Sequence, residues 1–457
     1  MFRLVGCSFL CLPVSCVRLL VLAKNESPRR KGDQLMRTLP VAGVDISKRF
    51  SDMCILTPEN EVFERLKIYH DTTSMERAQA ALQKAAQTFG KAPVIVMEST
   101  SHYHLILFQF FSDAGYEVIV VNPLQSNALK NINVRKVKTD KVDAYRLALL
   151  YRMNVLRRSQ VPTDALRSLR MLCRQHYELK GDITRYKNRL TALLDQTFPG
   201  FSKVFADVGA AGALAVLELY PTPSNVLSSD PLHIAHLIQK ASHKSQKYGL
   251  RKMELLFEAA TQAERIGIHA PGDQVLVRSL ITILKQLVDG AALIDRQIQT
   301  LAKQNEYIRV NTDLLQTIPG VGMFSSAVIL SEIGDFSLFS KPKQLAAYFG
   351  LDPSERQSGT MQSARNKLSK RGSPYIRAVL YMVAHNTVHT NRFGSVGNPV
   401  LADFYQRKCQ TKTPNVAICA VMHKLSNIIF AVLRDQRPFE LRSPEVHAKM
   451  ICTKLAA

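Results

Sequence analysis

Short apolar runs alternate with amphipathic stretches over residues 39–155. Runs of aliphatic residues bounded by turn-forming residues predict strands at 41–46, 52–56, 62–68, 94–97 and 117–121. Apolar residues at every third or fourth position predict helices near 73–89, 103–114 and 140–153. Strands followed by alternating strands and helices predict a mixed sheet flanked by helices, which is an α/β domain.

Two later stretches keep a helical pattern of apolar residues over a greater length. Apolar residues alternate at spacings of three and four over about four heptads in each, which predicts a helical coiled-coil middle. The first run is Leu169, Leu172, His176, Leu179, Ile183, Tyr186, Leu190 and Leu193. The second run is Val277, Leu280, Leu284, Leu287, Ala291, Ile294, Ile298 and Leu301. We expect the runs to pair antiparallel or to join two copies of the chain, with His176 as a core residue. Residues 199–271 between them predict a small helical insertion.

The remaining part is predicted to be mainly helical, with one glycine-rich turn. Residues 318–322 read Ile-Pro-Gly-Val-Gly between two helical stretches, which is a helix-hairpin-helix signature. Gly320 and Gly322 permit a tight turn whose amide groups, with the following helix N-terminus, can hold a phosphate. A packed turn between helices without nucleic acid is the alternative.

Four carboxylates lie at the ends of predicted strands or at the start of a predicted helix. Asp45 and Glu98 each end an apolar run, where a buried acid is costly unless it is paired or binds a cation. Asp140 and Asp143 are three residues apart, which places both on one face of a helix. Such a set can hold two hard cations through oxygen ligands, as enzymes of phosphoryl transfer do. Each acid taken singly has an ordinary structural explanation, so the prediction depends on the ordered set.

The charge of the chain indicates the class of its partner. Sixty Lys and Arg residues against 37 Asp and Glu residues give a net charge of +23. A balance this basic indicates a polyanion such as nucleic acid, and an inert basic surface is the alternative. The candidate backbone contacts near the acids and after the glycine-rich turn are Lys136, Lys138, Arg365, Lys370, Arg371 and Arg377. A further basic track flanks the first apolar run at Arg167, Arg170, Arg174, Lys180, Arg185, Lys187 and Arg189.

Other classes of site have no support in the sequence. The eight cysteines form no C-x-x-C pair and no zinc-finger grouping with histidine, which favours a reducing compartment. The chain contains neither a Walker A loop nor a G-x-G-x-x-G motif, so nothing predicts ATP or dinucleotide binding.

The ordered motifs resemble the DEDD transposases of the insertion sequence 110 family. The resemblance is carried by Val-Asp45-Ile-Ser-Lys, Glu98-Ser-Thr-Ser-His-Tyr, Val121-Asn-Pro and Lys138-Thr-Asp-Lys-Val-Asp143-Ala, and it spans residues 39–439. It implies a RuvC-like, ribonuclease-H-type domain and Mg²⁺-dependent DNA recombination. It also implies that Ser358, otherwise an ordinary loop serine, is the catalytic nucleophile, because Gln-Ser-Gly matches the family's serine position. It further implies a bridge RNA that selects donor and target DNA by base pairing.

These observations together predict five segments and one activity. The segments are a leader at 1–36, a RuvC-like catalytic domain at 37–155, a helical coiled-coil region with an insertion at 156–312, a C-terminal domain with the helix-hairpin-helix and the serine at 313–440, and a tail at 441–457. We expect translation to start at Met36, so that the leader is not part of the protein. A secretory signal or membrane anchor is the alternative for the leader. We expect a cytoplasmic transposase, a homodimer or homotetramer, with no membrane partner. The alternatives are a Holliday-junction-type nuclease that uses the four acids alone and a non-catalytic basic DNA-binding scaffold.

Overall fold

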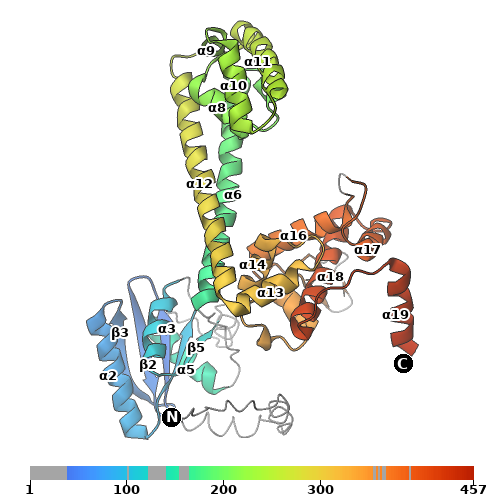
Figure 1. Ribbon diagram of the computed structural model, residues 1–457. Coiled ribbons are helices and arrows are strands. Elements are labelled where there is room, and N and C mark those ends of the chain that lie inside the picture. Colours follow the sequence, from blue (N-terminus) through green and yellow to red (C-terminus); the bar gives the residue numbers. More distant parts are fainter. Residues whose placement is uncertain are drawn as a thin grey trace, which may run out of the picture. The chain divides into compact units, whose positions relative to one another are not determined.

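The chain forms two compact units that divide between residues 161 and 162. Figure 1 shows the computed structural model, which describes residues 39–99, 102–121, 140–153, 164–353, 357–358, 361–362, 367–390 and 393–456. Each unit has its own buried apolar clusters.

The first unit contains a five-stranded mixed sheet in the order β3-β2-β1-β4-β5. The strands are β1 (Val41–Ile46), β2 (Phe50–Leu56), β3 (Val62–Tyr69), β4 (Val94–Glu98) and β5 (Val118–Val121). β1, β2 and β3 are antiparallel neighbours, whereas β1, β4 and β5 are parallel. Parallel neighbours require crossovers, which are the helices α2 (Thr72–Phe89) and α3 (His104–Asp113). The α/β prediction for this part is confirmed, and each predicted strand end agrees within two residues.

The two faces of the sheet are covered by different helices because successive strand residues point to opposite sides. The even-numbered residues of β1 pack in a cluster with α2 and α3. Val41, at the start of β1, packs on the other face with α5 (Asp140–Arg152). α5 lies so close to β1 that a Cβ atom on Gly43 would lie 2.0 Å from the carbonyl oxygen of Ala144. Glycine at this position therefore permits the contact of the helix with the sheet.

Two long helices of the second unit, α6 (Asp164–Thr197) and α12 (Asp273–Gln304), pack side by side (Figure 1). Leu169 of α6 and Ile298 of α12 share one apolar cluster, whereas Leu190 of α6 and Leu284 of α12 share another. The start of each helix therefore lies beside the end of the other, so the pair is antiparallel. All sixteen positions of the two predicted apolar runs are buried or half-buried.

A group of shorter helices packs at the end of α6 and the start of α12 (Figure 1). The helices are α7 (Phe201–Val204), α8 (Ala211–Leu219), α9 (Pro223–Leu227), α10 (Pro231–Ser242) and α11 (Gln246–Ile266). The sequence between the two apolar runs is therefore helical, as predicted.

The C-terminal helices and the start of α6 form the largest apolar cluster. The helices are α13 (Glu306–Gln316), α14 (Met323–Ile333), η1 (Phe336–Leu338), α15 (Pro342–Tyr348), α16 (Pro374–Val388), α17 (Pro399–Cys409) and α18 (Pro414–Asp435). A two-stranded hairpin of β6 (Gln357–Ser358) and β7 (Met361–Gln362) follows α15, and α19 (Pro444–Ala456) is the last helix. Among the described helices, α18 is long and apolar enough to span a membrane by length and composition alone. However, 56% of its apolar window is buried, and residues such as Leu425 and Ile429 lie in the cluster, as expected of a core helix.

Candidate functional site

Three acidic residues lie in one row across neighbouring strands of the sheet. The antiparallel strands β1 and β2 pair Asp45 directly with Asp52. Asp45 and Glu98 follow the last paired residues of the parallel strands β1 and β4, so they are neighbours in the same register. On the other side of Asp52, β3 contributes Lys67. The row across the sheet is therefore Lys67, Asp52, Asp45 and Glu98.

The three acids belong to the face of the sheet that α5 covers. Cys54 and Val96, which lie two residues from Asp52 and Glu98 on the same strands, pack in the apolar cluster that contains α5. Because side chains two residues apart share a face, Asp52 and Glu98 point to this side. Asp52 and Glu98 are buried, with 6% and 8% of their surface exposed, and Asp45 is half-buried.

The helix that covers this face contributes a fourth described acid. Asp143 of α5 is 5% exposed, and Arg146 Nη1 donates to Asp143 Oδ1 at 3.2 Å. Asp140 is the first residue of α5, and its side chain lies outside the described residues. Among the residues that the structure describes, no three side chains of His, Cys, Asp or Glu form a group that could hold a metal ion. The fold therefore brings these acids to one face of the sheet without gathering the described ones into a ligand shell.

The chemistry of the donor set suits a hard divalent cation. Every candidate ligand is a carboxylate, and Mg²⁺ prefers oxygen ligands. The close contact at Gly43 also fixes the distance between β1 and α5, which are the elements that contribute Asp45 and Asp143. The donor chemistry of these residues therefore suits the Mg²⁺ ion that the family resemblance implies.

The serine motif lies in the second unit, in a loop whose base is closed. β6 pairs Ser358 with Met361, while the side chain of Ser358 lies outside the described residues. Below the hairpin, the Ser369 amide donates to the Asp352 carbonyl oxygen at 2.8 Å, and Pro353 forms an isolated bridge with Leu368. The segment before the serine loop is therefore hydrogen-bonded to the segment after it.

The basic motif after the loop takes part in the same closure. Gly350 has a φ of +70°, and a Cβ atom there would lie 2.7 Å from the amide nitrogen of Gly372, so this crossing of two backbone segments requires glycine. The Arg377 guanidinium donates to the carbonyl oxygen of Gly372 and, at 3.5 Å, to that of Phe349. Burial lowers the pKa of Arg377. This guanidinium holds the loop, a role that its place in a basic stretch did not indicate.

The other predicted nucleic-acid contacts have different surroundings. Lys370 has a φ of +53°, and Lys370 and Arg371 are both exposed beside the closed base of the loop. Lys136, Lys138 and Arg365 lie outside the described residues.

The glycine-rich turn joins α13 to α14, and its two glycines have different roles. Gly320 has a φ of +87°, and a Cβ atom there would lie 2.6 Å from Thr387 Oγ1 of α16. The Thr387 hydroxyl donates to the Pro319 carbonyl oxygen at 2.9 Å, so this side of the turn is docked on α16. Gly322 is exposed at the start of α14, and a Cβ atom there would meet nothing within 4 Å among the described residues. Both glycines are exposed, but the space beside the Gly320 Cα is taken by α16, whereas the space beside the Gly322 Cα is open among the described residues.

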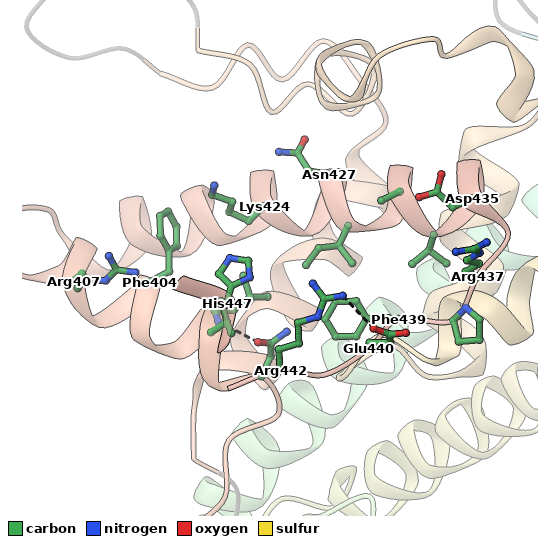
Figure 2. A pocket seen from close by; sticks show the side chains of 17 residues that line it. Phe404, Arg407, Lys424, Asn427, Asp435, Arg437, Phe439, Glu440, Arg442 and His447 are labelled. Atoms are coloured by element: carbon green, nitrogen blue, oxygen red, sulfur yellow. Dashed lines mark hydrogen bonds and ion pairs between the residues drawn. The ribbon is translucent and has the colours of Figure 1, made fainter. Parts of the chain in front are cut away.

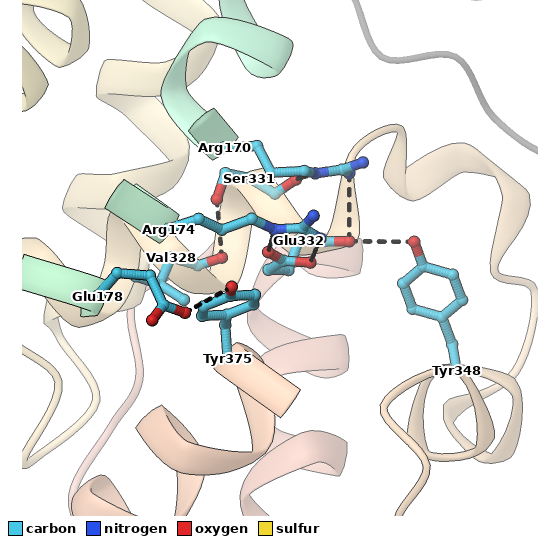
Figure 3. A network of polar contacts seen from close by, with 8 residues as sticks. All are labelled: Arg170, Arg174, Glu178, Val328, Ser331, Glu332, Tyr348 and Tyr375. Carbon is cyan, nitrogen blue, oxygen red and sulfur yellow. Dashed lines mark hydrogen bonds and ion pairs between the residues drawn. The ribbon is translucent and has the colours of Figure 1, made fainter. Parts of the chain in front are cut away.

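A buried ion pair joins α6 to α14 (Figure 3). Arg174 Nε and Nη2 donate to Glu332 Oε1 and Oε2 at 2.7 and 2.9 Å, and this pairing raises the pKa of Arg174. Arg170 Nε donates to the Ser331 carbonyl oxygen at 2.7 Å, and Tyr348 donates to the Glu332 carbonyl oxygen at 3.1 Å. Arg170 and Arg174 therefore make structural contacts between helices, a role that their place in the predicted basic track did not indicate.

A cleft of about 720 Å³ lies along α18 (Figure 2). Its charged lining consists of Arg407, Lys424, Arg437, Arg442, His447, Asp435 and Glu440. Part of this charge is neutralised locally, because Arg442 pairs with Glu440 at 3.1 Å and Arg407 pairs with Asp403 at 2.8 Å. None of the sequence-predicted site residues lines the cleft.

Comparisons with known proteins identify this chain as similar to DNA transposases. Residues 42–199 match a family model for DEDD transposases of the IS110 type, described as a transposase. Residues 312–406 match a second family model, described as a transposase of the IS116/IS110/IS902 family. The first match contains Asp45, Glu98, Asp140 and Asp143, and the second contains Ser358. The chain belongs to the IS110 family of DEDD transposases.

Individual relatives match different lengths of the chain. The 43.6 kDa protein of insertion element IS110 from Streptomyces coelicolor is 24% identical over 81% of this chain and 89% of its own length. The pilin gene-inverting protein of Moraxella lacunata is 35% identical over 34% of this chain and 47% of its own length. The transposase of insertion sequence IS1111A from Coxiella burnetii is 26% identical over 44% of this chain and 55% of its own length. The chain thus covers most of the IS110 protein and about half of the other two relatives.

Proposed function

We propose that this protein cuts and rejoins DNA at a metal site formed by Asp45, Glu98, Asp140 and Asp143. The observation that supports the proposal is that Asp45 and Glu98 are neighbours on the face of the sheet covered by α5, the helix that begins at Asp140 and contributes the buried Asp143. The four carboxylates would hold Mg²⁺. When bound, the ions would activate the attacking oxygen and stabilise the charge that develops on the scissile phosphate.

Ser358 is the nucleophile of the proposed reaction. Its hydroxyl oxygen would form a bond with phosphorus while the bond from phosphorus to the leaving DNA oxygen breaks, and the hydroxyl proton would end on that leaving oxygen. The product is a phosphoserine link that a second DNA end can displace. A serine hydroxyl is a weak nucleophile that needs activation, and a bound metal ion would supply it by stabilising the alkoxide form. The closed base of the serine loop supports this role, because it limits the positions available to Ser358.

The experiment uses the full chain, Mg²⁺ and labelled DNA that carries the element ends. Asp140→Asn and Asp143→Asn should bind DNA but not cleave it, because one anionic oxygen ligand becomes a neutral amide. Ser358→Ala should form no covalent protein–DNA adduct on a denaturing gel, whereas the matched control Ser363→Ala should form it normally. Cleavage in excess chelator would refute the metal site, and an adduct that persists in Ser358→Ala would move the role to another serine.

We further propose that a bridge RNA from the same element selects the target DNA by base pairing. A net charge of +23 supports a polyanionic partner, and a guide that base-pairs leaves the protein to hold backbone and RNA shape. A homodimer or homotetramer in the cytoplasm would bring donor and target DNA together, and no membrane takes part. Purified protein, donor and target should recombine at the specified site only when the RNA is present. Equal site-specificity without RNA would refute the guide.

A further inference from the structure

The segments on the two sides of the serine loop are joined by a side-chain contact as well as by the backbone. The Ser369 hydroxyl donates to Asp352 Oδ1, in addition to the hydrogen bond from the Ser369 amide to the Asp352 carbonyl oxygen. The next residue, Pro353, faces Leu368 in the isolated bridge. Proline has no amide hydrogen, so Pro353 cannot donate a backbone hydrogen bond across the base of the loop. The side-chain contact between Ser369 and Asp352 supplies a hydrogen bond beside this position.

Both partners of this contact are attached to backbone that the fold holds in place. Leu351, directly before Asp352, is 2% exposed and belongs to the largest apolar cluster. Directly after Ser369, the Lys370 amide donates to the Gly350 carbonyl oxygen at 3.2 Å. Gly350 is also the residue at which the two segments cross closely. A contact built on fixed backbone limits the movement of the chain that lies between its partners.

The loop that this contact closes spans residues 353–368 and contains Ser358. A reacting group has to be held in the correct geometry, and a misplacement of about 1 Å can lower a rate about 10²-fold. We propose that Asp352 and Ser369 are positioning residues for Ser358, because their contact fixes the base of the loop that carries the nucleophile. The inference rests on the proposed function, since it deepens the role of Ser358. In this role the Ser369 hydroxyl is a hydrogen-bond donor to Asp352 and does not attack DNA.

The test separates the rate of the serine step from DNA binding and from stability. The full chain is mixed with Mg²⁺ and saturating labelled DNA that carries the element ends, and the rate of covalent adduct formation is followed on denaturing gels. DNA affinity and melting temperature are measured on the same proteins. The variants are Asp352→Ala, Ser369→Ala, the double variant, and Ser369→Thr, which keeps a hydroxyl. The matched control is Ser224→Ala, because the Ser224 hydroxyl also donates to a carboxylate, that of Glu264 at 2.8 Å, in the helical insertion.

We expect each single alanine variant to lower the rate of adduct formation about tenfold or more, while DNA affinity stays within about twofold of the wild type. The double variant should be no slower than the slower single variant, because both changes remove the same contact. Ser369→Thr should recover most of the rate, and Ser224→Ala should keep it. Variants that melt at a lower temperature but form the adduct at the wild-type rate would overturn the inference, since the contact would then be structural only. Additive losses of rate in the double variant would overturn it as well.

The outcomes also distinguish this inference from the proposed function. An adduct that is lost in Ser369→Ala but persists in Ser358→Ala would make Ser369 the nucleophile and overturn both. An adduct that is lost in Ser358→Ala but forms at the wild-type rate in Asp352→Ala and Ser369→Ala would overturn the positioning role alone and leave Ser358 as the nucleophile.

Discussion

The ion pair between Arg174 and Glu332 should be a main contact between α6 and the C-terminal helices. The Glu332 side chain is 4% exposed and receives both hydrogen bonds from one guanidinium (Figure 3). Arg174→Met keeps much of the apolar stem and removes the charge, which leaves a buried carboxylate without its partner. Removing one member of a fully buried pair costs about 3–5 kcal/mol. The Arg174 side chain is 42% exposed, so water reaches this pair, and we expect a loss of about 2–3 kcal/mol in the free energy of unfolding.

The assay is a double-mutant cycle with Arg174→Met, Glu332→Leu and the double variant. Replacing both members by apolar residues removes the uncompensated charge, so the double variant should regain most of the stability that Arg174→Met loses. A coupling energy of about 1.5 kcal/mol or more is expected, because the two side chains are in direct contact. Hydrogen–deuterium exchange localises the effect, with faster exchange expected in α14 and at the start of α6.

Arg185→Met is the matched control for this cycle. Arg185 lies on the same helix, pairs with Asp182 at the surface and is 64% exposed, so its removal should cost less than about 1 kcal/mol. Equal losses for Arg174→Met and Arg185→Met, or additive effects in the cycle, would refute the structural role of the buried pair.

The other predictions concern close packing and pH. Gly43→Ala should displace α5 from β1, because the new Cβ atom would lie 2.0 Å from the Ala144 carbonyl oxygen. We expect this variant to lose both stability and Mg²⁺ affinity. The control is Gly181→Ala within α6, where an added Cβ meets open space among the described residues, and it should raise the free energy of unfolding by up to about 1 kcal/mol. Burial, and to a smaller extent the nearby Lys180, lowers the pKa of His176 below its ordinary value of 6.5. As pH falls, His176 is therefore protonated more readily in the unfolded chain than in the folded protein. The contribution of His176 to the free energy of unfolding is for this reason lost as pH falls below about 6.5. Thermal unfolding of His176→Leu between pH 7.5 and 5.5 should therefore show a smaller loss of stability than the wild type, and an unchanged slope would contradict this assignment.

The sequence predicts the elements of this protein better than it predicts their partners. The strands of the first unit were predictable because apolar runs and turn residues are local signals. The two apolar runs likewise identified the helices α6 and α12. By contrast, Arg174 pairs with a glutamate 158 residues away, and no local pattern distinguishes such an arginine from a solvent-exposed one. The same holds for Arg377, whose carbonyl partners depend on how the serine loop closes.

The row of acids contains one residue, Asp52, that no local pattern distinguishes. Its strand was predicted, but Asp52 lies near the start of β2, whereas the predicted ligands lie at strand ends and at a helix start. Its position beside Asp45 depends on the register between β1 and β2. That register was accessible in principle, since two strands joined by a short turn are expected to pair as a hairpin. The neighbourhood of Asp45 and Glu98 was harder to predict, because parallel pairing across a long crossover has no local signature.

The acids of the sheet and the described acid of the helix have different neighbours. In the sheet, Asp45 faces Asp52 directly and has Glu98 as its neighbour on the other side. On α5, Asp143 is paired with Arg146. Removing the Asp143 carboxylate should therefore forfeit its contact with Arg146, which thermal unfolding of Asp143→Asn in chelator would measure.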